Sequence, residues 1–234
     1  MADIFREVDE EVRRERILKL WANNRHVIIA LAIILVAGTG AWRFYTYQRD
    51  SAAQAAGARY EAAAQLAREG KSGEAAAAFE ELSRTAPKGY ASLARLRAAN
   101  ERAASDSQAA VQEYESLAAD ASADAGLRDL AKLRAAMLRV DSDDPLEFEK
   151  KFAPLASDSF AYHHQIRELL GLAALRRSSF DSAERWFDGI ASDPRAPAGV
   201  RMRAEALMSI AQASMSPQNG KQAAQGPDGE ASAK

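Results

Sequence analysis

The sequence predicts an all-α protein, in which an N-terminal transmembrane helix is followed by a superhelix of antiparallel helical hairpins. Long stretches consist of Ala, Leu, Glu, Arg and Gln, which are strong helix formers. The β-branched residues that favour strands are concentrated in one uncharged run, and no alternating strand pattern occurs outside it. Small and aromatic residues also recur at a spacing typical of helical repeats.

The composition excludes several classes of function. The chain has 234 residues and a net charge of -2, so it offers no basic field that would hold nucleic acid. Cysteine is absent, which excludes disulfides, thiolate metal sites and thiol nucleophiles. No carboxylate stands in apolar surroundings that would mark it as a catalytic acid or base. We therefore expect no enzyme, no cofactor and no small-molecule substrate.

The run Val27 to Trp42 has the composition of a membrane-spanning helix. It carries no charge, and its valines, isoleucines and leucines together favour insertion by about 2–5 kcal/mol. The run is shorter than the hydrocarbon layer, and aromatic residues extend it at both ends. These interfacial aromatics are Trp21, Trp42, Tyr45 and Tyr47. The sequence thus predicts a transmembrane helix over residues 26–47.

Two other interpretations of this run are open. Small residues at Ala37, Gly38, Thr39 and Ala41 fit the cleavage point of a signal peptide, although the preceding segment is long and acidic for one. The run also fits a buried helix of a soluble domain, which the flanking aromatics disfavour.

The distribution of Lys and Arg predicts the orientation of the span. Six basic residues precede the run and three follow it within a comparable distance: Arg6, Arg13, Arg14, Arg16, Lys19 and Arg25, then Arg43, Arg49 and Arg59. This bias favours a cytoplasmic N-terminus and an exported C-terminal domain. Residues 1–25 are predicted to form a cytoplasmic amphipathic helix, with Phe5, Val8 and Val12 on one stripe. This helix either touches lipid headgroups or docks on a partner.

Residues 48–213 contain four units with the spacing small-x(11)-small-x(3)-aromatic-x(2)-aliphatic. The units are Ala63, Ala75, Phe79 and Leu82; Ala98, Ala110, Tyr114 and Leu117; Ala136, Phe148, Phe152 and Leu155; and Gly171, Ala183, Phe187 and Ile190. Small residues let two helices approach closely, and an aromatic three residues before an aliphatic lies on the same helix face. Phe148 departs from the pattern, and we expect it to splay the third hairpin.

Turn residues divide each unit into two helices. The predicted turns are 70–73, 104–107, 141–145 and 177–181. A last helix over 197–213 is predicted to cap the array, and residues 214–234 lack periodicity and are predicted to form a disordered tail.

Two clusters of potential metal ligands occur in the sequence, and neither has a complete set of ligands. His163 and His164 point about 100° apart on a helix, and neither Cys nor a further His completes a site. The acids Asp141, Asp143 and Asp144 lack the glycine and glutamate that a calcium loop needs, so they predict a capped turn. We therefore expect no metal site.

The four units resemble the tetratricopeptide repeat, a helix-turn-helix of similar length. That resemblance implies a partner-binding groove along the first helix of each hairpin. The Lys and Asn with which some family members clamp a terminal carboxylate are absent. The equivalent side of the chain presents Tyr60, Leu130, Leu133, Met137, Leu172 and Leu175. We interpret these residues either as an apolar groove for extended segments, with Met supplying adaptability, or as ordinary core.

The opening MADIFREVDEEVRRERILKLW, the single span and the Ala-rich repeats resemble a narrower group. This is the tetratricopeptide repeat-like family of the ancillary subunit of the bacterial Sec translocon, in its alphaproteobacterial form. The resemblance implies an inner-membrane protein with a periplasmic domain. Its implied partners are membrane lipid, translocon subunits, periplasmic chaperones and exported chains. The alternatives are a scaffold for cell-envelope or division machinery, and a secreted adaptor released by cleavage.

Overall fold

The structure, a computed structural model, describes residues 2–215, except for the side chains at 2–13, 15–20, 22–24 and 28. Residues 216–234 of the predicted tail and the side chains of the apolar stripe in the N-terminal segment therefore lie outside what is described, while residues 214 and 215 belong to the last helix. All regular structure between residues 2 and 215 is helical, which confirms the predicted fold class. The helices are α1 (Ala2–Arg68), α2 (Ser72–Thr85), α3 (Lys88–Arg102), α4 (Ser107–Ala119), α5 (Ala125–Arg139), α6 (Pro145–Phe152), the 3₁₀ helix η1 (Ala153–Ala156), α7 (His163–Arg176), α8 (Phe180–Ala191) and α9 (Ala198–Met215).

The chain divides into two compact units, one ending at Ala55 and the other beginning at Ala56. The first unit is helical throughout and belongs to α1. The predicted borders at 25/26 and 47/48 mark no break in that helix, because α1 runs without interruption to Arg68. The second unit holds the last turns of α1 and all the helices from α2 to α9.

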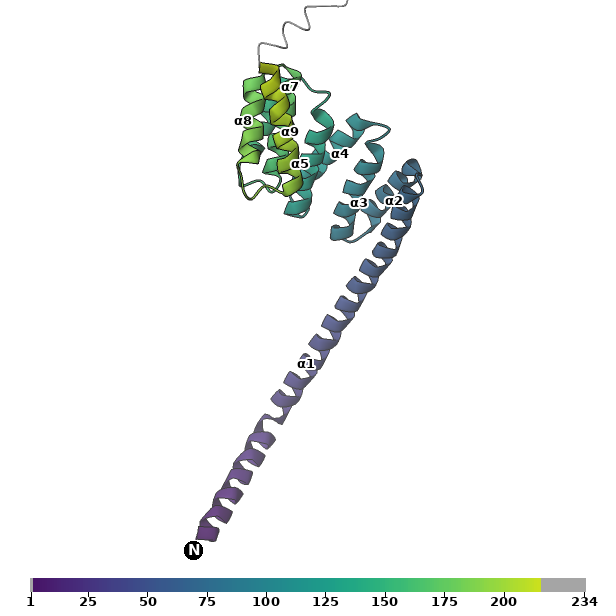
Figure 1. The fold of residues 1–234 in the computed structure, drawn as a ribbon. Coiled ribbons are helices and arrows are strands. Elements are labelled where there is room, and N and C mark those ends of the chain that lie inside the picture. The colour runs from purple at the N-terminus through teal and green to yellow at the C-terminus, as the bar shows by residue number, and fades with distance from the viewer. Residues whose placement is uncertain (1, 216–234) are drawn as a thin grey trace, which may run out of the picture. The chain divides into compact units, whose positions relative to one another are not determined.

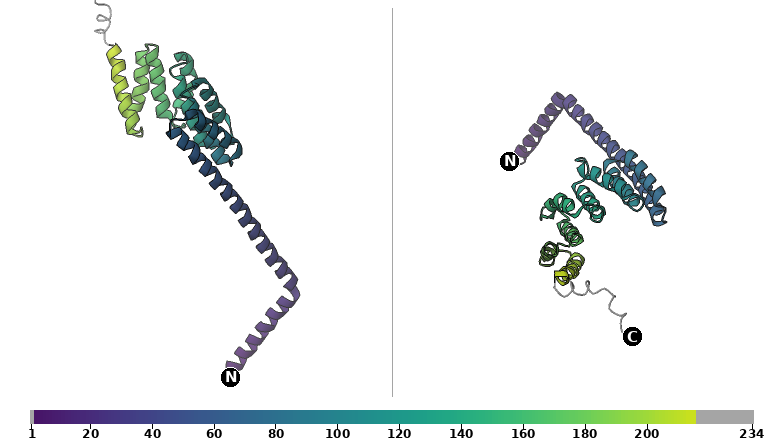
Figure 2. Two further views of the ribbon diagram at one scale, coloured as in Figure 1. Left: turned by 90° about the vertical axis from the view of Figure 1, so that its right-hand side faces the viewer. Right: turned by 90° about the horizontal axis from the view of Figure 1, so that it is seen from above.

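In the second unit, the helices from α2 onward pack against their neighbours along the chain, except that α5 and α6 hardly touch. Figure 1 labels most of these helices, and the views of Figure 2 show them following one another from teal to yellow. The odd-numbered helices α3, α5, α7 and α9 also contact each other in sequence, so they form one layer, called here the odd layer. Short antiparallel hairpins that repeat in this way bury a continuous core between neighbouring units.

The residues of the four-unit spacing form this core. Every one of them is buried except Leu155, which is half-buried. Each aromatic belongs to a cluster that joins its own hairpin to the next helix, so that Phe79 packs with residues of α3 and Tyr114 with residues of α5. At Gly171 the close approach is extreme, because a Cβ there would lie 2.4 Å from the Phe187 ring.

The third hairpin differs from the others. Its second helix, α6, has only 8 residues, and it packs against α7 far more than against α5. Phe148 and Phe152 are both buried, and their ring centroids lie 4.6 Å apart within the cluster that includes Ile166. A second aromatic in place of a small residue therefore accompanies a splayed hairpin, as the sequence predicts.

The turns lie within about one to two residues of the predicted positions. Gly70 takes a positive φ of 77° after α1, where Lys71 N–H donates to the Leu66 carbonyl and ends the helix. Asp106 caps α4 by accepting from Ala109 N–H. At the start of α6, Asp144 accepts from two backbone N–H groups with Pro145 at the first position, which confirms a capped turn at this site.

A polar contact recurs at the three junctions between successive hairpins and again where the last hairpin meets α9. A glutamate on the second helix of one hairpin pairs with a long side chain at the end of the next odd-layer helix. The four pairs, called here the junction pairs, are Glu80–Arg102, Glu115–Arg139, Glu149–Arg177 and Glu184–Gln212. The glutamates are spaced by 35, 34 and 35 residues. The junction pairs therefore repeat along the chain as regularly as the small, aromatic and aliphatic residues of the core.

Candidate membrane anchor and interaction surface

The apolar part of α1 has no covering within the structure. One candidate membrane span begins at Arg25, and its most apolar window of 18 residues has a mean hydropathy of 2.1 with none of that window buried. Ile34 and Leu35 are each 69% exposed. Such a surface is far larger than the apolar patches that soluble monomers expose. A single-pass membrane anchor is compatible with it, whereas a helix buried in a soluble domain is not.

The four interfacial aromatics all lie on the surface of α1. Trp21, Trp42, Tyr45 and Tyr47 are each more than half exposed. They bracket the apolar window on both sides along the helix, as the sequence indicates. Tyr and Trp favour the headgroup level because one end of the ring is apolar and the other forms hydrogen bonds with water.

The residues of the predicted groove separate into two groups. Leu133 is 7% exposed and belongs to the core that surrounds Phe148, and Leu175 packs at the edge of the core around Phe187. Tyr60 packs on Phe79, with 5.2 Å between the ring centroids, and its hydroxyl accepts a hydrogen bond from Arg97 at 2.9 Å. For these three residues the structure favours the core interpretation.

Leu130, Met137 and Leu172 reach the surface to different extents. Met137 is 47% exposed, while Leu130 and Leu172 are partly buried against the core. Sequence reasoning did not single out Leu169, which is partly buried against the same core, or Arg134, which is exposed on α5 one turn after Leu130. We define the central face as Leu130, Arg134 and Met137 of α5 together with Leu169 and Leu172 of α7.

The helical register explains why the central face lies on one side of the odd layer. Leu130, Arg134 and Met137 follow the spacing i, i+4, i+7, so they share one side of α5. Ala131, Ala135 and Ala136 on the other side are buried. α5 contacts α7 directly, and Leu130, Leu169 and Leu172 are partly buried against the same core cluster, so the central face draws on both helices. The result is a mixed surface of aliphatic side chains, one flexible thioether and an arginine.

A second concave region lies between α2, α3 and α4. It encloses about 450 Å³ and is lined by charged side chains that include Glu80, Arg95, Arg102 and Glu113. Both arginines already have carboxylate partners, since Arg102 bonds both glutamates and Arg95 donates to Asp120 at 2.6 Å. This cleft therefore stabilises the junction between hairpins and offers no free charge to a ligand.

The side chains of the two histidines at the start of α7 do not point apart, although neighbouring residues on a helix are expected to do so. Their ring centroids lie 3.9 Å apart, and Asp193, from the connection between α8 and α9, lies beside them. Asp193 is 29 residues away from His164 in the chain, so spacing arguments did not associate them. Only the packing of α7 against α8 brings this acid to the histidines.

An array of helical hairpins joined to an apolar helix defines an α-helical repeat protein, a class that typically acts as a non-catalytic scaffold for protein contacts. Residues 19–207 match the tetratricopeptide repeat-like domain family. Since this match covers most of the chain, the protein belongs to that family. No curated protein and no solved structure matches the chain.

Proposed function

We propose that this protein is a membrane-anchored, periplasmic adaptor that assists the Sec translocon and its chaperones with exported proteins. The observation that carries the proposal is the uncovered apolar window of α1, which belongs to the same continuous helix as the first repeat. A repeat domain that is attached to its own anchor stays close to the membrane where exported chains emerge. Six basic residues before the apolar run against three after it support export of the repeats.

The central face is the surface that we propose for partner binding. An exported chain that has not yet folded is extended and exposes apolar side chains. Leu130, Leu169 and Leu172 offer apolar contact to such a segment, Met137 adapts to different side chains, and Arg134 favours acidic neighbours. Exposed Met137 and Arg134 are not needed to close the core, so they are available for contact.

Photo-crosslinking in living cells tests this assignment. A photoreactive residue at Met137 is expected to capture exported chains, translocon subunits or periplasmic chaperones. The same residue at Leu146, which is 60% exposed on α6 outside the odd layer, serves as the matched control and is expected to capture far less. Capture of cell-wall or division enzymes at Met137 instead supports a scaffold, and equal capture at both positions contradicts binding by the central face.

The direction of insertion has a separate test. A reporter enzyme that is active only in the periplasm, fused after residue 215, is expected to be active in the full chain and inactive when residues 1–47 are removed. Activity of a cytoplasmic reporter at the same place contradicts the proposed topology. Release of the mature repeat domain into the soluble periplasm supports a cleaved leader instead of an anchor.

A further inference from the structure

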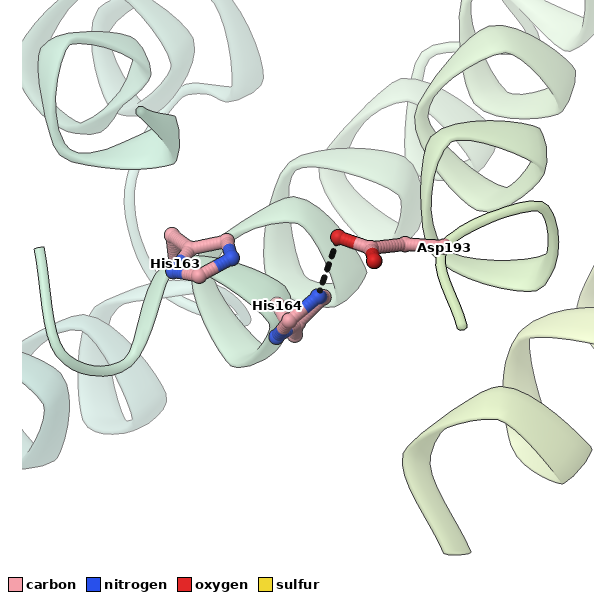
Figure 3. Close-up of side chains that lie close together, drawn as sticks. All are labelled: His163, His164 and Asp193. Atoms are coloured by element: carbon pink, nitrogen blue, oxygen red, sulfur yellow. Dashed lines mark hydrogen bonds and ion pairs between the residues drawn. The ribbon is translucent and has the colours of Figure 1, made fainter. Parts of the chain in front are cut away.

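His163, His164 and Asp193 form the one group of potential metal ligands found among the described residues (Figure 3). The two histidines begin α7, and Asp193 approaches from the connection between α8 and α9. One ligand atom from each residue lies within 4.8 Å of the others. His164 Nε2 is 3.0 Å from Asp193 Oδ2, and Asp158 Oδ1 lies 3.8 Å from His163 Nε2.

The hydrogen bonds of His163 leave one nitrogen ready for a ligand. His163 Nδ1 lies 2.8 Å from the Phe160 carbonyl oxygen, which can only accept, so Nδ1 carries the proton. His163 Nε2 therefore has a free lone pair, and this atom is buried without a hydrogen-bond partner. Histidines that bind metals are usually held in this way, with the second ring nitrogen donating to a backbone carbonyl or a carboxylate.

The two carboxylates of the cluster have several polar partners. Asp193 accepts hydrogen bonds from the Arg195 side chain and backbone and lies 3.0 Å from His164 Nε2. Asp158 accepts hydrogen bonds from Arg195 and Arg167. Two carboxylates next to two imidazoles supply charge that offsets the positive end of α7, which by itself disfavours a cation.

We propose that this cluster binds one divalent cation of the zinc class through His163 Nε2, His164 Nε2 and the Asp193 carboxylate. Two imidazoles and a carboxylate are a ligand set that zinc accepts, and Asp158 is close enough to complete four-fold coordination. Zinc bonds to nitrogen and oxygen are about 2.0–2.2 Å long, so the ligand atoms need to approach to within roughly 3.5 Å of each other. The proton on His164 Nε2 moves to Nδ1, and the cation takes its place beside Asp193.

Arg195 is the competitor of the cation. Its guanidinium forms ion pairs with Asp158 and Asp193, at 2.5 and 3.2 Å. It therefore already supplies the positive charge that a bound metal ion would bring to these two carboxylates. The side chain is 66% exposed and has room to swing into solvent. Removal of this charge is therefore expected to strengthen metal binding, a result that a purely structural ion-pair cluster does not give.

The experiment uses the full chain in detergent, with affinity tags cleaved and metals removed by chelation. Zn²⁺ is titrated by calorimetry, and Co²⁺ serves as a spectroscopic probe because tetrahedral Co²⁺ absorbs far more strongly than octahedral Co²⁺. We expect one site per chain with the tetrahedral spectrum. Asp193→Asn and His163→Gln are each expected to weaken binding by on the order of 100-fold, and Arg195→Gln to tighten it by at least about 10-fold.

His26→Ala provides the matched control, since it removes the one histidine outside the cluster. Circular dichroism of the metal-free variants checks that each of them folds. Because Asp193→Asn keeps the size of the side chain, a folded variant is expected. The proposal is overturned if the wild type binds no metal, if Co²⁺ gives only the octahedral spectrum, or if binding is unchanged in Asp193→Asn and His163→Gln.

Discussion

Gly171 and Phe187 show how one missing methyl group allows two helices to approach. A Cβ at Gly171 would lie 2.4 Å from the Phe187 ring, and this ring is fully buried. We predict that Gly171→Ala lowers the free energy of unfolding by about 1–3 kcal/mol, because either the ring or α7 has to shift in a closely packed core. Thermal unfolding of the repeat domain, measured by circular dichroism, is the readout.

Gly189→Ala is the control for that prediction. Gly189 lies near the end of α8, and a Cβ there meets nothing within 4 Å. Alanine at such a helical position is expected to stabilise the protein by up to about 1 kcal/mol. If Gly171→Ala is as stable as Gly189→Ala, the close approach of Phe187 does not limit the packing.

Asp120 gives a pH dependence with a defined sign. Hydrogen bonds from the Ser122 side chain and backbone and from Arg95 lower its pKa below the ordinary value. Such a carboxylate stabilises the folded state above its unfolded pKa of about 3.9, and this contribution is lost as the pH falls through the folded pKa. We predict that the free energy of unfolding falls more steeply with acid in the wild type than in Asp120→Asn. Parallel pH curves of the two proteins argue against this role.

At the level of residues, the sequence predicted the core positions better than the surface. The small-aromatic-aliphatic spacing identified buried residues because close helix packing tolerates few residue types at those places. Helical periodicity places Leu133 and Met137 near one face but does not say what covers each of them. Leu133 is buried in the core cluster that includes Phe148, and Met137 is exposed. The approach of Asp193 to His164 was equally beyond local spacing, because it depends on the packing of distant helices.

Among the described α-helices, α6 is the shortest, and an aspartate side chain caps its start. It has 8 residues, and Asp144 accepts from the backbone N–H groups of Leu146 and Glu147. We predict that Asp144→Ala lowers the free energy of unfolding by about 1 kcal/mol, since two donors at the helix start lose their acceptor. Asp141, which is exposed and lies three residues earlier, provides the matched control variant Asp141→Ala. An equal loss of stability in Asp141→Ala shows that net charge rather than capping is responsible.

Helix boundaries were predictable where the sequence contains a turn residue. Gly70, Asp106 and Pro145 lie at three observed turns, and each has a local reason to end or begin a helix there. α1 instead continues through Asn23 and Asn24, which are typical turn residues, and through both predicted borders. The composition changes at 25/26 and 47/48, while the helix continues through both positions.

At the scale of the whole molecule, the proposed attachment to a membrane rests on the uncovered window of α1. Two lysines at its centre cost about 5–7 kcal/mol of insertion free energy, which exceeds the 2–5 kcal/mol that the run supplies. We therefore predict that the double variant Ile34→Lys and Leu35→Lys moves from the membrane fraction to the soluble or aggregated fraction after carbonate extraction.

The control for this variant keeps the same added charge outside the apolar window. Ser51→Lys together with Gln54→Lys lies further along α1, where both residues are exposed and polar. This protein is expected to stay in the membrane fraction. Membrane retention of the Ile34→Lys and Leu35→Lys variant shows that another part of the chain holds the protein there.

The junction pairs have a consequence for the evolution and engineering of the array. Because each junction uses a similar glutamate and a similarly placed long side chain, the two surfaces that meet at one junction resemble those at the next. A tandem duplication of one complete hairpin, such as α3 with α4, then creates a new junction whose partners are already complementary. The length of the array is thus adjustable in whole hairpins, whereas an insertion of half a hairpin would place second helices in the odd layer.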